Sequence, residues 1–211
     1  MYTLPYFKEK NETVVLDFIR SHPFATITGF DGEYPVTTHI PLEAEFDDNG
    51  KMILRGHMMR KTDHHLAFEK NDKVLVVFHG PQCYVSASWY SNPQSGSTWN
   101  YITVHAKGRI SFTDEAGTYE AVKRVTNYFE GQGNAGSFDQ LPDSYVLPML
   151  KAIVGFRIEV DETDNVFKLS QNRDEPSFLN IIEKLRESGD HDSALIAEEM
   201  EKRRAELFGK Q

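Results

Sequence analysis

The densest cluster of chemically active side chains is the stretch RGHMMRKTDHH at residues 55–65. Arg60 and Lys61 stand directly before Thr62, whose residue type often caps the start of a helix. The free N–H groups at a helix start and the positive end of its dipole attract anions. The stretch therefore predicts a site for a phosphate-sized anion, and Gly56 would let the backbone approach that ligand closely. The alternative is a solvated corner whose charges face water.

Metal binding is the second chemistry that this histidine-rich stretch suggests. His64 and His65 are adjacent, so they do not share one face of a helix. The sequence has no H-E-x-x-H pattern and no cysteine cluster. Histidines on single strands are more often hydrogen-bonded structural residues, so we predict no dedicated metal site. The strand histidines that a barrel could still bring together are His39, His57, His79 and His105.

Nucleophilic catalysis finds little support in the sequence. Cys83 is the only cysteine, and no neighbour along the chain would activate it. Its simplest interpretation is a small buried apolar residue. There is no G-x-S-x-G motif, and the glycine-rich stretch at 131–136 follows a predicted helix, which indicates a loop.

Both tryptophans lie in one loop-like stretch, SASWYSNPQSGSTWNY, at residues 86–101. Flat aromatic rings stack on flat ligands, and Trp and Tyr are enriched where a surface meets a partner. The alternative is a loop folded over its own barrel with Trp89 and Trp99 as lid residues. In either case we expect both rings to be at least partly buried.

The elements that must position these residues are mostly short strands. Residues 36–46 alternate with period two, which puts one face in a core. Pro41 has no N–H to donate to a ladder, so this strand should lie at a sheet edge or carry a bulge. The alternation of residues 101–112 predicts another strand with one buried face. Further strands are predicted at 25–30, 52–58 and 73–80, and as a final hairpin from 152–162 and 165–171.

Helices are predicted at 12–21, from Thr62 or Asp63 to about residue 70, and after a cap at Thr113 or Asp114. A short helix is predicted near 142–150, and residues 177–211 are predicted to be helical. Strands do not alternate regularly with long helices, which excludes a doubly wound sheet. Many short strands with Gly, Asp and Asn turns favour a β-barrel decorated with helices.

Composition narrows the class of partner and the compartment. The 211 residues carry a net charge of −9, so the chain lacks the overall basic field that binds phosphate backbones. The one basic helical stretch, EKRRAELF at 201–208, interleaves its cations with glutamates, as solvated helix faces do. A single cysteine and an N-terminus unlike a signal peptide indicate a cytoplasmic protein. No apolar run approaches the roughly 20 residues of a membrane span.

Several blocks together resemble the PaiB family. They are HIPL, LRGHMMR, GPQCYVSASWY, TWNYITVHAKGRI, LKAIVGFRIEV and KLSQNR, in family order across nearly all of residues 1–173. The family is described as FMN-binding negative transcriptional regulators with a split β-barrel akin to pyridoxamine-phosphate-oxidase-like flavoproteins. The resemblance implies an α+β chain with an antiparallel split barrel of about six strands over 1–173. Residues 174–211 would then be a C-terminal helical extension packed on the same domain.

The resemblance also implies FMN at a homodimer interface. Thr38, His39 and Ile40 would run beside the isoalloxazine ring. Arg60, Lys61 and Thr62 would grip the phosphate, in agreement with the anion site predicted from charge and capping. This chain has Thr62-Asp63 where the family often has Asn-Pro. The other cofactor-binding candidates are Arg55, Gly56 and His57 beside the phosphate, Trp99, Asn100, Tyr101 and His105 at the pocket or from the partner, and Lys168 and Arg173 on a late strand.

The resemblance implies an FMN-binding dimeric negative regulator. DNA is a weakly supported partner, so regulation of gene expression could be direct or indirect. The second hypothesis is a flavin- or haem-dependent oxidoreductase of the split-barrel class. In that case the cofactor would carry the chemistry, and His39, His57 or His105 could ligate a haem iron. The third hypothesis is a module that binds an unrelated small anion.

Overall fold

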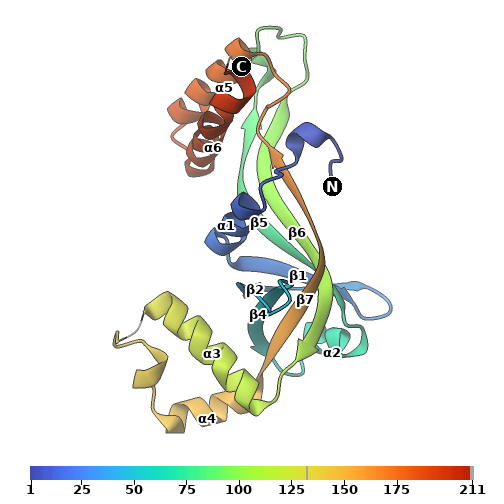
Figure 1. The fold of residues 1–211 in the computed structure, drawn as a ribbon, viewed down its shortest axis with the longest axis vertical. Coiled ribbons are helices and arrows are strands. Elements are labelled where there is room, and N and C mark those ends of the chain that lie inside the picture. Colours follow the sequence, from blue (N-terminus) through green and yellow to red (C-terminus); the bar gives the residue numbers. More distant parts are fainter. Residues whose placement is uncertain (132, 210–211) are drawn as a thin grey trace. The chain divides into compact units, whose positions relative to one another are not determined.

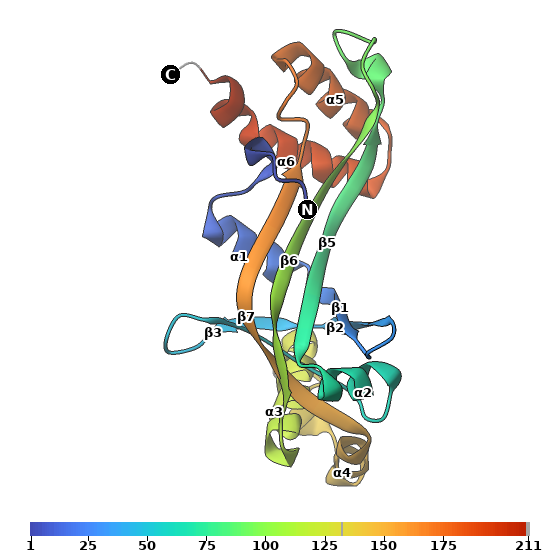
Figure 2. The same ribbon diagram turned by 90° about the vertical axis from the view of Figure 1, so that its right-hand side faces the viewer.

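The computed structural model describes residues 1–131 and 133–209. Within them lie seven strands in one sheet, in the order β2-β1-β5-β6-β7-β4-β3. The strands are β1 (Phe24–Phe30), β2 (Pro35–Pro41), β3 (Glu43–Phe46), β4 (Met52–Met59), β5 (Lys73–Val85), β6 (Thr98–Phe112) and β7 (Ile153–Lys168). The α-helices are α1 (Glu12–Ser21), α2 (Asp63–Lys70), α3 (Glu115–Glu130), α4 (Asp143–Ala152), α5 (Glu175–Glu187) and α6 (His191–Phe208). Figures 1 and 2 show these elements.

The chain divides into two compact units. Unit 1 comprises Met1–Val15, His79–Val104 and Asp164–Gln211, and unit 2 comprises Leu16–Phe78 and His105–Thr163. The domain boundary expected at residue 173 stays a prediction. No helix in the described part of the chain is both long enough and apolar enough to cross a membrane.

The connection between β2 and β3 determines how the sheet of unit 2 curls. The sequence predicted one strand over 36–46, and this prediction is wrong because the chain breaks at Leu42 into two strands. β2 and β3 lie at opposite ends of the strand order, yet one residue joins them. The sheet must therefore curl until its two edges meet at Leu42. The edge position expected for the strand carrying Pro41 is confirmed.

Leu42 is held at this junction by its backbone and its side chain. Its N–H donates to the Pro23 carbonyl over 2.8 Å, and its side chain is only 4 % exposed. Gly56 on β4 leaves space for it, because a Cβ there would lie 3.0 Å from Leu42 Cδ2 and 2.8 Å from Phe156 Cζ. The curled sheet thus surrounds a tightly packed interior, although its edge strands β2 and β3 are not paired with each other.

Antiparallel ladders set which residues of unit 2 face inward. The β1–β2 hairpin pairs Phe24 with Pro41 and Phe30 with Pro35. Its turn is fixed by the Asp31 carboxylate, which accepts from the N–H groups of Glu33 and Tyr34 over 2.7 Å. β4 pairs with β7 along its length. The most deeply buried side chains of this interior include Ile27, Ile53, Leu54, Phe78, Phe156 and Ile158.

Unit 1 packs two C-terminal helices against each other, as Figure 1 shows. α5 buries Phe178 and Ile181, and α6 buries Ile196 and Met200. The described part of the stretch predicted to be helical from 177 to 211 is divided between α5 and α6, which ends at Phe208, and residues 210–211 lie outside the described residues. The break falls at Gly189, whose φ of 70° is left-handed, and the next helix is capped by Asp190.

The final hairpin predicted over 152–171 is wrong, because β7 is one continuous strand. Two of the expected turn residues, Asp164 and Asn165, bond instead to the N-terminal segment of unit 1. Asp164 forms an ion pair with Lys8. The Asn165 side chain accepts from the Glu9 N–H over 2.8 Å and donates to the Glu9 carbonyl over 3.0 Å. These bonds tie the strand to the N-terminal segment, and β7 continues through the expected turn.

Because Leu42 fills the junction of the two sheet edges, Leu42→Ala should lower the free energy of unfolding by about 2–4 kcal/mol through lost burial and a residual cavity. Urea denaturation measures this change. The matched control is Leu66→Ala on α2, where the side chain is 46 % exposed and the change should stay within about 0.5 kcal/mol. Equal losses in the two variants would contradict the assigned role of Leu42.

Candidate functional site

The turn from β4 into α2 has the geometry that the sequence predicted. Thr62 is the N-cap of α2, and its hydroxyl oxygen accepts from the His65 N–H. The same hydroxyl donates to the Met59 carbonyl over 3.1 Å. Lys61 adopts a left-handed φ of 61°, which is uncommon for a residue other than glycine. The cap and this turn direct the start of α2.

Two cations at this corner are uncommitted. Arg60 is half-buried, and its position is fixed because its backbone N–H donates to the Ala152 carbonyl and its Nε to the Ile153 carbonyl, each over 2.8 Å. Lys61 is exposed. Neither side chain forms an ion pair with any residue that the structure describes. Their charges are therefore available to an anion.

The start of α2 also carries an acidic group. The Asp63 carboxylate accepts from the His64 N–H over 2.8 Å and lies 3.0 Å from His64 Nδ1. The backbone hydrogen bond from His64 is the main reason that the pKa of Asp63 is lowered. With Asp63 charged and the Thr62 hydroxyl bonded to the backbone, a phosphate here would rely on Arg60 and Lys61. The corner fits a phosphate group on that basis.

Arg55 and Gly56, predicted beside the phosphate, have other neighbours in the structure. Arg55 forms an ion pair with Glu45. Arg124 from α3 then bridges Glu43 and Glu45 over 2.6 and 2.7 Å. This cluster neutralises the charge of Arg55. Gly56 faces the interior of unit 2, so its small size serves packing there.

His57, on the same strand, lines a cavity of about 530 Å³ with residues of α3, α4 and the segment before α4. Its Nδ1 is buried and has no hydrogen-bond partner among the described residues. Burial lowers the pKa of His57, so the imidazole is favoured in its neutral form. An unpaired ring nitrogen at a cavity wall is suited to a hydrogen bond with a bound molecule.

The remaining candidates of unit 2 lie on β2 and β6. Thr38 is half-buried, His39 is exposed and Ile40 is buried on β2. The His39 ring stacks with Phe24 at a centroid distance of 6.3 Å. His105 is half-buried on β6.

Unit 1 holds the aromatic candidates. Trp89 is half-buried as expected, but Trp99 is 53 % exposed and meets the Tyr84 ring edge-on at 6.1 Å. The reason is the alternation of β6: Asn100 takes the inward position and exchanges hydrogen bonds of 3.0 and 3.1 Å with the Ser170 hydroxyl. Tyr101 is half-buried, and burial raises its pKa. Asn100 therefore has a structural partner, whereas the Trp99 ring remains available to a ligand or a partner.

Lys168 and Arg173 form a second pair of cations within unit 1. Lys168 donates to the Thr98 hydroxyl, and its pKa is lowered by burial and then by the charge of Arg173. The Arg173 guanidinium lies 3.9 Å from the centre of the Tyr90 ring. Its Nε is buried without a hydrogen-bond partner among the described residues. Tyr90 was not among the residues predicted to bind the cofactor, although it lies directly after Trp89 in the aromatic stretch.

A metal centre and a cysteine nucleophile have no structural support in the described part of the chain. No group of three His, Cys, Asp or Glu side chains there is arranged to hold a metal ion. Cys83 is buried, and desolvation raises its pKa to about 12. A thiol at this pKa is protonated near neutral pH, so it lacks the thiolate that nucleophilic attack requires.

Comparison with known proteins identifies the family. A family model described as "Putative FMN-binding domain" matches residues 1–162. The protein "Protease synthase and sporulation protein PAI 2" of Bacillus subtilis is 34 % identical over 202 residues, which cover 95 % of this chain and 97 % of that protein. The chain belongs to this FMN-binding family, the PaiB family. The predicted family and the predicted FMN cofactor are thereby confirmed.

A more distant relative and two solved structures are also similar to this chain. The uncharacterized protein AN0679 of Emericella nidulans is 27 % identical, over 81 % of this chain and 84 % of that protein. The flavocytochrome Anf3 from Azotobacter vinelandii has a TM-score of 0.62 at 13 % identity, covering 79 % of this chain and 72 % of that one. An FAD- and haem-binding protein from Mycobacterium smegmatis has a TM-score of 0.56 at 13 % identity, covering 76 % and 73 %. The predicted antiparallel split-barrel fold with peripheral helices is confirmed, and its sheet has seven strands.

The burial of Cys83 leads to a direct test of thiol reactivity. In the native protein at pH 8, Ellman's reagent should leave the thiol unmodified over the time in which glutathione reacts fully, because both burial and a pKa of about 12 suppress the thiolate. In guanidinium chloride the reagent should titrate one thiol per chain, which is the internal control. Fast modification of the folded protein would show that the thiol is accessible.

Proposed function

We propose that the FMN phosphate binds at the corner between β4 and α2, held by Arg60 and Lys61. The observation that carries this proposal is the pair of uncommitted cations at a helix start, in a chain with an FMN-binding domain. Charge-assisted hydrogen bonds from such groups are among the stronger ones in proteins. Thr62 acts indirectly, because its cap orients α2 and the turn before it. When bound, the flavin supplies one- and two-electron transfer.

The flavin ring is proposed to lie against β2 and β4. His57 stands on the strand that leads into the phosphate corner, and its unpaired Nδ1 offers a hydrogen bond to a ring heteroatom. Thr38, His39 and Ile40 are the β2 residues proposed beside the ring, and His105 is proposed to line the pocket. Arg55 and Gly56 contribute through the ion-pair cluster and the interior packing that hold β4 in place.

A homodimer is proposed to complete the flavin site. The exposed Trp99–Tyr84 pair presents a large apolar surface, which a second copy of the chain would bury. Tyr101, Lys168 and Arg173 from unit 1 of the second copy are the candidates that would reach the flavin. Asn100 would support them through its bonds to Ser170.

The protein is proposed to be cytoplasmic. Its effect on gene expression is proposed to be indirect. The PaiB family is described as negative transcriptional regulators, and this description supports a regulatory role for the chain. A net charge of −9 opposes binding to the phosphate backbone of DNA. The flavin state of the protein would then be transmitted through another molecule.

The phosphate assignment predicts the behaviour of the Arg60→Ala/Lys61→Ala double variant. Its affinity for FMN should fall by about 100-fold or more, because two charged hydrogen-bond donors to the phosphate are lost. Its affinity for riboflavin, which has no phosphate, should stay within about threefold of the wild type. Flavin fluorescence quenching measures both affinities.

Lys73→Ala, an exposed cation of the same unit, is the matched control and should bind FMN like the wild type. An equal loss of FMN and riboflavin binding in the double variant would place the effect outside the phosphate. Unchanged FMN binding would overturn the assignment of the corner.

Indirect regulation predicts weak DNA binding by the purified dimer. With FMN present and at 150 mM salt, fluorescence anisotropy of labelled promoter duplexes should give dissociation constants no tighter than about 1–100 µM, the non-specific range. Random duplexes of equal length serve as the control. Sequence-selective binding at nanomolar concentrations would establish direct regulation instead.

A further inference from the structure

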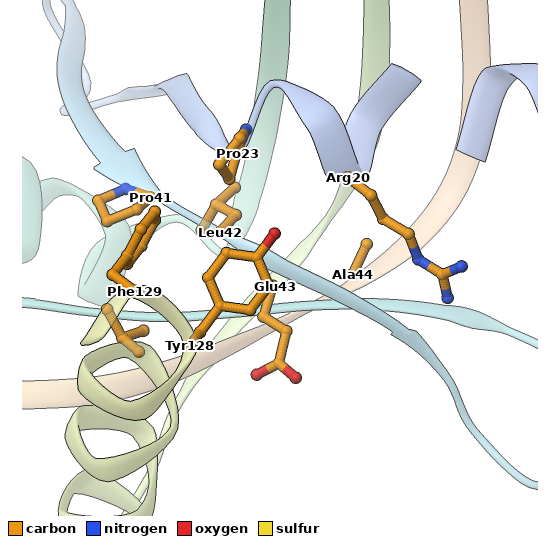
Figure 3. A pocket seen from close by; sticks show the side chains of 9 residues that line it. Arg20, Pro23, Pro41, Leu42, Glu43, Ala44, Tyr128 and Phe129 are labelled. Atoms are coloured by element: carbon orange, nitrogen blue, oxygen red, sulfur yellow. The ribbon is translucent and has the colours of Figure 1, made fainter. Parts of the chain in front are cut away.

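A second pocket in unit 2 shares no lining residue with the cavity at His57. It measures about 240 Å³ and is lined by residues from the end of α1, the β2–β3 junction and the end of α3. None of the fifteen predicted cofactor-binding residues lines it. Figure 3 shows Tyr128 and Phe129 of α3 facing the junction at Pro41 and Leu42.

The wall of this pocket formed by Pro23, Pro41 and Leu42 is rigid and apolar. Pro23 and Pro41 have fixed φ angles and no N–H groups, so they bring no backbone donor that would need a partner. Leu42, held by its bond to the Pro23 carbonyl, forms the wall between them. Such a surface favours an apolar ligand that needs no hydrogen bonds from the walls.

The opposite wall is aromatic and largely uncovered. Tyr128 and Phe129 pack edge-on at a centroid distance of 4.9 Å, yet they are 61 % and 59 % exposed. Adjacent aromatic rings this exposed leave apolar area in water that a bound ring would cover. A volume of about 240 Å³ is below the 300–1,000 Å³ typical of drug-sized ligands, so one aromatic ring is the appropriate size.

The charges around the pocket favour an anion. Glu43 at the rim is committed to Arg124, which contacts both of its carboxylate oxygens over 2.6 and 2.8 Å. Glu45 is paired with Arg124 and Arg55. Arg20 lines the pocket, is exposed and forms no ion pair with any residue described.

Arg55 and Arg124 thus neutralise the two glutamates, and Arg20 is the lining residue that keeps an unpaired charge among the described residues. The carbonyl end of α1 carries a partial negative charge of about half an electron, which the full charge of Arg20 exceeds.

We propose that this pocket is a binding site for a small aromatic monocarboxylate, with the ring between the prolines and the α3 aromatics and the carboxylate at Arg20. Such a ligand is distinct from FMN, whose phosphate and three-ring system exceed the pocket in charge and size. Pro41 directly follows Ile40, so the pocket borders the β2 segment proposed beside the flavin. The inference does not depend on the flavin assignment.

Ligand-observed NMR titrations with benzoate, benzyl alcohol and benzylamine test the proposal on the full chain. Benzoate should bind saturably with a dissociation constant of about 1 mM, as expected for a ligand of this size. Benzyl alcohol should bind at least about fivefold more weakly, because it lacks the charge that Arg20 contacts. Arg20→Gln should reduce benzoate binding to the level of benzyl alcohol, and Phe129→Ala should weaken both ligands.

Lys73→Gln and Phe30→Ala, an exposed cation and a partly exposed ring elsewhere in the same unit, are the matched controls and should bind benzoate like the wild type. Thermal unfolding monitored by circular dichroism checks that every variant is folded. Equal binding of benzoate and benzylamine, no saturable benzoate binding, or full binding by Arg20→Gln would each overturn the proposal. Loss of benzoate binding in the Arg60→Ala/Lys61→Ala variant would assign the benzoate to the cofactor corner instead.

Discussion

The single-residue connection at Leu42 is the constraint on which unit 2 depends. A strand order that places β2 and β3 at opposite ends requires an open sheet to curl when one residue joins those strands. Leu42 satisfies this requirement with a buried side chain and a backbone bond to Pro23. The same junction fixes three features. It leaves β2 with one ladder partner, it seats β4 where it leads into α2, and it forms one wall of the second pocket.

Charge in unit 2 is divided between structure and binding. Arg55 and Arg124 form ion pairs with Glu43 and Glu45, and these pairs hold β3, β4 and α3 together. Arg60 has its backbone and Nε fixed by carbonyl groups, which orients the guanidinium without neutralising it. A cation that is positioned but unpaired costs the fold little reorganisation when an anion arrives. Arg20 has the same unpaired character at the second pocket, without the same backbone support.

The family and the geometry constrain the cofactor in different ways. Membership in an FMN-binding family establishes the ligand but does not assign individual side chains to it. The structure separates side chains with partners, such as Asn100 and Arg55, from those without, such as Lys61 and His57. The first group is committed to the fold and the second is free to bind. Of the cofactor-binding residues predicted from the sequence, those without a partner in the fold are therefore the stronger candidates for direct contact with FMN.

The sequence by itself determined the local structure and the family. The helix at 12–21 and the alternation of residues 101–112 depend on neighbouring residues alone, and both are present in the structure. The sequence offered two candidates for each helix cap, Thr62 or Asp63 and Thr113 or Asp114, and the structure uses Thr62 and Asp114. Tertiary contacts decided the rest. Period-two alternation over 36–46 could not reveal that the strand breaks at Leu42, because the alternation of residue types continues across Leu42. In the structure β2 alternates between exposed and buried positions, whereas no residue of β3 is buried. The turn predicted near Asp164 is absent from the structure. Asp164 and Asn165 instead bond to Lys8 and Glu9, which lie far away in the sequence. Which arginines lack an ion pair depends on their distances in space from Glu43 and Glu45. The spacing of these residues along the chain does not determine those distances.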